Sequence, residues 1–141
     1  MDDISTITKF LRNQIAEMRG ETSIVSVYLF GSILKGNAGK TSDIDLAFLL
    51  DEKAYKSDAI IAMSPAHLIA TKVGTQLDRE TDVTILNSAS LEIAYEVVTT
   101  GKCLFEIDQD LRMEYEIKIK GMYFDFRPFL EELRAKSLAH L

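Results

Sequence analysis

Two short, almost wholly apolar segments lie near one another in the N-terminal half of the chain. Residues 24–30 read Ile-Val-Ser-Val-Tyr-Leu-Phe and residues 44–50 read Ile-Asp-Leu-Ala-Phe-Leu-Leu. Runs of this length, rich in β-branched and aromatic side chains, are typical of strands that are buried on both faces. A sheet covered on both faces needs helices on each side, so these runs predict an α/β fold.

Helical patterns alternate with the predicted strands. Apolar side chains recur every three or four positions in the segments that surround the two runs, which is the period of an amphipathic helix. The expected helices cover residues 4–18, a segment that starts at Ser64 and Pro65, residues 91–98, and the chain from Asp108 onward. Gly101 is expected to end the third of these in a left-handed conformation, and Pro128 to kink or break the last.

Two further short strands are expected at residues 82–86 and 102–106. The sequence therefore predicts a small mixed β-sheet flanked by helices, followed by a C-terminal helical region. With 141 residues, of which 47% are hydrophobic, the chain has the size of one domain spanning residues 1–141.

Charge and residue usage exclude several classes of function. A formal net charge of -6 repels a phosphate backbone, so no long nucleic acid is expected as a partner. The single Cys103, with only two histidines, excludes a disulfide scaffold and a zinc ribbon. The sequence contains neither an apolar run long enough for a bilayer nor a basic signal peptide, so we expect no membrane association and a cytoplasmic location.

The most informative stretch is Gly31-Ser32 followed, after ten residues, by Asp43-Ile44-Asp45. Side chains alternate between the two faces of a strand, so Asp43 and Asp45 should point to one side and Ile44 to the other. Two neighbouring carboxylates repel each other unless a cation neutralises them, and hard oxygen ligands favour magnesium or manganese. The pair therefore predicts a metal site.

Asp82 opens a later predicted strand and could bring a third carboxylate to the same place. Three carboxylates can hold two ions about 3.5–4 Å apart, the arrangement used for in-line displacement at phosphorus. Gly31 at the end of a buried strand would let backbone amides approach an anion, and the Ser32 hydroxyl could donate to it. Lys35 and Lys40 lie in the intervening segment and could neutralise a triphosphate.

The order of these parts resembles the nucleotidyltransferase superfamily of the DNA polymerase beta type. Its signature is a Gly-Ser pair followed by Asp-x-Asp after about ten residues, and the short chain is similar to the minimal nucleotidyltransferases. Residues 31–36, 101–106 and 123–126 also resemble family segments, although Ile33 and Lys35 stand where many members carry a basic residue and an arginine. Members of the antitoxin group pair with small helical HEPN ribonuclease toxins.

The resemblance implies a role for each matching residue. Asp43, Asp45 and Asp82 would hold two magnesium ions and catalyse transfer, with Asp82 helping to activate the attacking hydroxyl. Gly31, Ser32 and Lys35 would bind the phosphates of ATP. The acceptor implied by kinship is a tyrosine hydroxyl on a cognate HEPN toxin, which would form a hetero-oligomer with this chain.

Two alternatives stay open from the sequence. One is a transferase for small molecules such as aminoglycosides, and the other is an antitoxin that neutralises its toxin by binding alone. A C-terminal region rich in aromatic and methionine side chains also has two interpretations, as core or as a partner surface. Its members are Met113, Tyr115, Met122, Tyr123, Phe124, Phe126 and Phe129.

Overall fold

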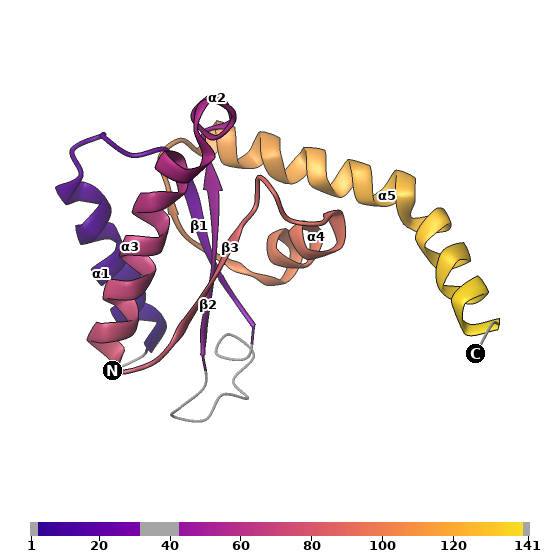
Figure 1. The fold of residues 1–141 in the computed structure, drawn as a ribbon, viewed down its shortest axis with the longest axis horizontal. Helices are drawn as coiled ribbons and strands as arrows, with labels where there is room; N and C mark the ends of the chain where they lie inside the picture. Colours follow the sequence, from indigo (N-terminus) through magenta and orange to yellow (C-terminus); the bar gives the residue numbers. More distant parts are fainter. Residues whose placement is uncertain (1–2, 32–42, 140–141) are drawn as a thin grey trace.

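A computed structural model of the chain describes residues 3–31 and 43–139 (Figure 1). Of the candidate residues, Ser32, Lys35 and Lys40 lie outside the described residues. Within them, four strands form one sheet in the order β3-β2-β1-β4. The strands are β1 (Ile24–Phe30), β2 (Ile44–Leu50), β3 (Thr81–Ile85) and β4 (Lys102–Glu106).

The sheet is mixed, as the sequence predicts. The central strand β1 pairs antiparallel with both β2 and β4, whereas β3 runs parallel to β2. The bounds of β1 and β2 coincide with the two apolar runs. Nearly every side chain in these strands is buried, because both faces of the sheet are covered.

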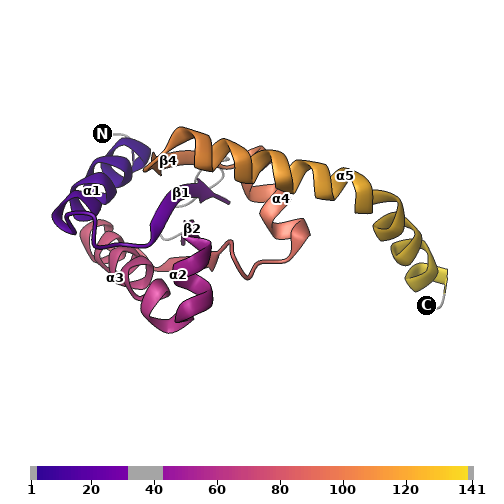
Figure 2. The same cartoon turned by 90° about the horizontal axis from the view of Figure 1, so that it is seen from above.

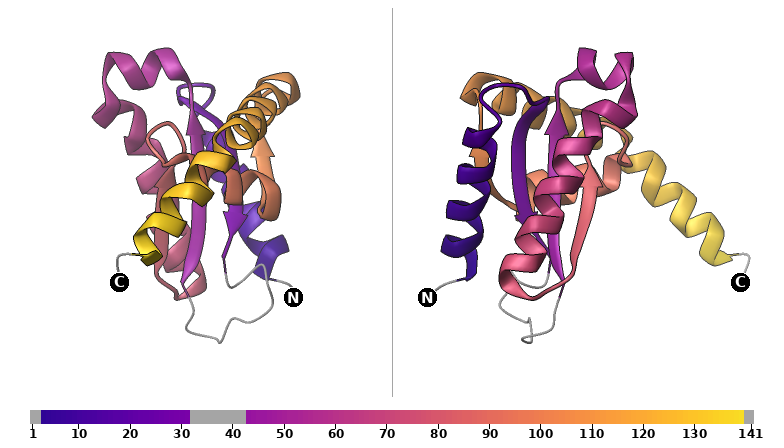
Figure 3. Two further views of the ribbon diagram at one scale, coloured as in Figure 1. Left: turned by 90° about the vertical axis from the view of Figure 1, so that its right-hand side faces the viewer. Right: turned by 60° about the vertical axis from the view of Figure 1, so that its left-hand side comes forward.

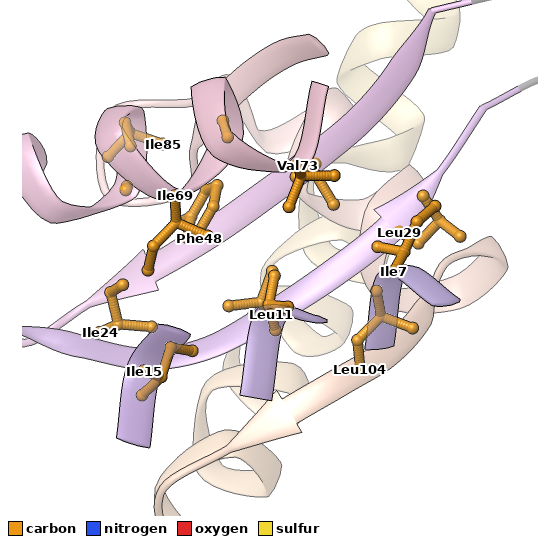
Figure 4. Close-up of a cluster of buried hydrophobic side chains, with 14 of the residues drawn as sticks. Ile7, Leu11, Ile15, Ile24, Leu29, Phe48, Ile69, Val73, Ile85 and Leu104 are labelled. Atoms are coloured by element: carbon orange, nitrogen blue, oxygen red, sulfur yellow. The ribbon is translucent and has the colours of Figure 1, made fainter. Parts of the chain in front are cut away.

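Helices α1 (Asp3–Glu17) and α3 (Ala59–Leu77) cover one face of the sheet (Figure 2). Their apolar side chains, among them Leu11 and Ile69, pack against Leu29 and Phe48 of the central strands (Figure 4). The opposite face is covered by α4 (Leu91–Thr100) and the N-terminal part of α5 (Gln109–Ala139), which form a second buried cluster. The core therefore has two layers, one on each side of the sheet.

The region between β2 and β3 differs from the prediction. A short helix, α2 (Glu52–Ser57), was not expected, and α3 begins at Ala59 and not at Ser64. Asp58 starts α3, since its carboxylate accepts a hydrogen bond from the backbone N–H of Ile61 at 3.1 Å.

Ser64 and Pro65 lie inside α3, so their predicted role as the start of a helix is wrong. The Ser64 hydroxyl donates to the carbonyl of Ile60 at 2.8 Å and caps nothing. Pro65 lacks the N–H that would serve the carbonyl of Ile61, but Ile61 is 70% exposed and water can serve it there. The helix continues through Pro65 because the carbonyl group that loses its hydrogen bond lies on the solvent-exposed side of α3.

The predicted left-handed cap at Gly101 is also wrong. Gly101 follows α4 with φ -77° and ψ 166°, a conformation open to any residue. A Cβ there would instead overlap the carbonyl oxygen of Val97 and lie 3.2 Å from that of Leu29. Glycine is needed chiefly because the backbone lies so close to the last turn of α4, and β1 leaves little further room.

Helix α5 is continuous from Gln109 to Ala139, with Pro128 inside it. The helix bends in its C-terminal half and extends beyond the sheet (Figures 1 and 2). The helix continues past Pro128, which excludes the predicted alternative of a break, and a bend in the half of α5 that contains this proline agrees with the alternative of a kink. Among the described residues, no helix combines the length and the hydropathy needed to cross a bilayer.

Candidate active site

The end of β1 meets the start of β2 at Gly31. In the antiparallel register Phe30 is paired with Asp45. Gly31 follows with φ +84°, and a Cβ at this position would overlap Oδ2 of Asp45 and lie 3.0 Å from its Cγ. The Asp45 carboxylate thus lies directly against the backbone of Gly31.

Asp82 lies opposite Asp45 on the neighbouring strand. The two residues are register partners in the parallel β2–β3 pair. Ile44 is fully buried in the layer under α1 and α3, so alternation turns Asp45 toward the α4 and α5 side. The structure therefore places the third predicted carboxylate, that of Asp82, beside the carboxylate of Asp45.

Electrostatics at Asp45 reflect this crowding. Burial raises the pKa of the Asp45 carboxyl, and repulsion from Asp82 and then Asp43 raises this pKa further, as does a hydrogen bond with Asp82. In the part of the chain that the structure describes, no Lys or Arg forms an ion pair with these three aspartates. The cluster is therefore suited to a cation supplied from outside.

The arrangement suits magnesium that arrives with a nucleotide. Within residues 3–31 and 43–139, no three acidic, histidine or cysteine side chains already converge closely enough to hold an ion alone. Magnesium is usually bound by one or two carboxylates together with substrate phosphates and water. Asp45 and Asp82 can supply those carboxylates. Asp43, which is exposed and directly precedes β2, can add a third.

The predicted phosphate-binding segment, which contains Gly31, Ser32 and Lys35, lies only partly within the described residues. Gly31 is described, whereas Ser32 and Lys35 are not. The structure adds a constraint on Gly31 that the sequence did not show, namely its contact with Asp45. A motif identifies the glycine, but the contact depends on how two strands pair.

Sequence reasoning also missed the contacts that set β3 against β2. The backbone N–H of Ile44 donates to the carbonyl of Glu80 at 2.9 Å, and the Thr81 hydroxyl donates to the carbonyl of Ala70 in α3 at 3.0 Å. These bonds hold the start of β3 level with the start of β2, and so place Asp82 opposite Asp45. Both hydrogen bonds join residues that are distant in the sequence, so no local pattern indicates these bonds.

A mixed sheet with a glycine at the end of one strand and facing carboxylates on two others is the arrangement that the sequence analysis expects of a nucleotidyltransferase. The family described as Polymerase beta, Nucleotidyltransferase matches residues 12–110. The chain belongs to this family, and its activity is nucleotidyl transfer.

Individual relatives agree with this assignment. The protein adenylyltransferase MntA of Shewanella oneidensis is 34% identical over 117 residues, which cover 83% of this chain and 74% of MntA. A crystal structure of a toxin–antitoxin with AMP-PNP contains a chain with a TM-score of 0.65 and 28% identity, covering 89% of this chain and 97% of that one. A tri-AMPylated Shewanella oneidensis HEPN toxin in complex with MNT antitoxin gives a TM-score of 0.60 at 26% identity, with 96% of both chains covered.

Proposed function

We propose that this chain is an antitoxin that transfers AMP from ATP to a tyrosine hydroxyl of a cognate HEPN toxin and so inactivates it. The observation that carries the proposal is the Asp45–Asp82 pair beside Gly31, in a chain 34% identical to a protein adenylyltransferase. Because the reaction consumes ATP, we place the protein in the cytoplasm.

In this proposal the three aspartates hold two magnesium ions. Bound magnesium supplies neutralisation of the triphosphate and of the charge that develops at the α-phosphate. Gly31, together with Ser32 and Lys35, binds the β- and γ-phosphates. The Asp45 carboxylate lies against the backbone of Gly31, so it would be close to a phosphate bound at this glycine.

The transfer itself is an in-line displacement. The tyrosine oxygen of the toxin attacks the α-phosphorus of ATP, the bond from that phosphorus to the bridging oxygen breaks, and pyrophosphate leaves. The carboxylate of Asp82 accepts the proton of the attacking hydroxyl. The products are a tyrosine phosphodiester of AMP and pyrophosphate.

The direct test is labelling of the toxin. The purified chain is incubated with the toxin, magnesium and α-labelled ATP, and compared with Asp45→Asn and Asp82→Asn. We expect label on the toxin with the native chain and a loss of at least about a hundredfold in rate with each variant. Equal labelling by the native chain and both variants would contradict the assignment of these carboxylates.

A second candidate function is neutralisation by binding alone, which is favoured by the exposed apolar side chains of α5. The Asp45→Asn variant separates the two functions. If it protects cells from the toxin as well as the native chain does, binding suffices; if protection is lost while the complex still forms, transfer is required.

A further inference from the structure

One face of α5 carries an apolar stripe with a regular spacing. Its side chains are separated alternately by four and three positions, which is the a/d pattern of a helix that packs along another helix. The stripe consists of Tyr115, Ile119, Met122, Phe126, Phe129 and Leu133. This spacing continues without interruption from the part of α5 on the sheet to the part beyond it.

The N-terminal part of the stripe is buried within the domain. Ile119 is 8% exposed in the cluster that covers the sheet, and Tyr115 packs against the same cluster. The C-terminal part is not covered in this way: Met122 is 38% exposed, Phe126 50%, Phe129 63% and Leu133 61%. The same face of α5 is thus buried in the core in its N-terminal part and exposed to solvent in its C-terminal part.

The exposed part of α5 is held in place by contacts with α4. The rings of Tyr123 and Tyr95 stack with their centroids 3.7 Å apart. Farther along, the Arg134 guanidinium pairs with Glu92 of α4 at 2.7 Å. We call residues 122–133 the α5 arm; it is a projection that presents apolar side chains and is contacted by α4 near both of its ends.

The α5 arm lies on the same side of the molecule as the carboxylates. The helix crosses the α4 side of the sheet, the side toward which Asp45 points. Beyond the sheet it bends toward the end of the molecule at which β1 ends and β2 begins (Figures 1 and 3). A protein seated on the arm would therefore lie on the side from which an acceptor must reach Asp45.

We propose that the α5 arm is the docking surface for a helix of the HEPN toxin, which it holds while the toxin tyrosine enters the active site. This inference rests on the proposed function. The alternating spacing of four and three positions is typical of a helix that packs along another helix, so we infer a helix as the bound element. Because the arm lies on the side toward which Asp45 points, we infer that this helix belongs to the protein substrate and not to a second copy of this chain. The likeness to the antitoxin of the solved toxin complex covers 96% of this chain, and therefore most of α5.

Phe126 and Phe129 are the side chains that the proposal makes most important. Their rings lie 6.5 Å apart and form one aromatic surface in the middle of the arm. Large aromatic side chains at the centre of an interface contribute most to its affinity. Phe124 offers a matched control, because it is 71% exposed on the same helix but lies off the stripe.

The test measures toxin binding by isothermal titration in an Asp45→Asn background, so that transfer is not needed for the readout. Phe126→Gln/Phe129→Gln should weaken binding at least about tenfold, and Phe124→Gln should change it less than about twofold. Glutamine is a good helix former, and circular dichroism checks that helix content is unchanged. With Asp45 restored, labelling of the toxin at low concentration should fall in the same order.

Equal affinity of the native chain, the double variant and the Phe124→Gln control would overturn the docking proposal. It would also be overturned if sedimentation showed a dimer of this chain that the double variant dissociates while toxin binding is unchanged, because the arm would then bind a second copy. Binding that depends on Phe126 and Phe129, without any AMP transfer by the native chain, would instead contradict the proposed function and leave the docking surface established.

Discussion

Oδ2 of Asp45 occupies the space in which a side-chain carbon of Gly31 would lie. Gly31 also has φ +84°, so two separate constraints require glycine at this position. Gly20 has nearly the same φ, +81°, but a Cβ there would meet no atom within 4 Å. Comparing alanine substitutions at Gly31 and Gly20 therefore separates the cost of the backbone conformation from the cost of displacing the Asp45 carboxylate.

Gly31→Ala should lower AMP transfer at least about a hundredfold, because it must displace Asp45, whose position catalysis requires. Gly20→Ala should cost about 1–2 kcal/mol of unfolding free energy for its left-handed backbone and leave transfer unchanged. Urea unfolding and labelling of the toxin measure the two effects. A Gly31→Ala protein with native transfer rates would show that the contact with Asp45 is unimportant.

Asp45→Asn should stabilise the protein when metal is absent. Asparagine removes the repulsion between Asp45 and its register partner Asp82, which is worth about 0.2–1 kcal/mol for charges facing each other in a sheet. Thermal unfolding in EDTA should therefore show a higher Tm for the variant. Magnesium with ATP should raise the Tm of the native chain more than that of the variant; the reverse order would argue against metal binding at this pair.

Glu116 of α5 accepts two hydrogen bonds, one from the sheet and one from within α5. Its Oε2 accepts from the Tyr28 hydroxyl at 2.7 Å and from Nη1 of Arg112 at 2.6 Å. Glu116→Ala should cost about 2–3 kcal/mol, because the Tyr28 hydroxyl and the Arg112 guanidinium lose a charged acceptor. Glu131→Ala, which removes only an exposed ion pair with Arg127, should cost less than about 0.5 kcal/mol in the same urea titration.

Tyr115 should make the protein sensitive to alkali. Its hydroxyl is buried with no hydrogen-bond partner among the described residues, and burial raises the pKa of Tyr115 from 10.0 to about 12. Because the folded pKa lies above the unfolded one, the contribution to stability is complete below pH 10 and is lost as the pH rises to about 12. This loss should reach on the order of 2 kcal/mol.

Tyr115→Phe tests this dependence. It should change stability little at pH 7, since the hydroxyl it removes has no partner in the described structure, and it should unfold less readily than the native chain at pH 12. Urea unfolding at the two pH values gives the comparison. A native chain and variant that lose stability in parallel above pH 10 would contradict the role of Tyr115.

Local patterns were sufficient for a large part of the fold. The two apolar runs predicted β1 and β2 at their observed bounds, because an uninterrupted run of apolar side chains is stable only where both faces of a strand are covered. Alternation predicted that Ile44 and Asp45 would face opposite sides, which depends only on strand geometry. The family followed from the spacing between Gly31 and Asp43, since that motif lies within one short stretch of chain.

Contacts between distant residues decided the rest. The start of α3 at Asp58 is an exception, since this cap is a local contact that the sequence analysis overlooked. Gly101, by contrast, is confined by Val97 and by the distant Leu29 and not by a left-handed backbone. Asp82 lies level with Asp45 only because β3 pairs with β2 in one particular register. Likewise, α5 carries a single continuous apolar stripe in the sequence, and only the extent of the sheet and of α4 determines that Ile119 is buried while Phe129 remains exposed. A side-chain pattern specifies which face is apolar, but the packing of other elements determines how much of that face is covered.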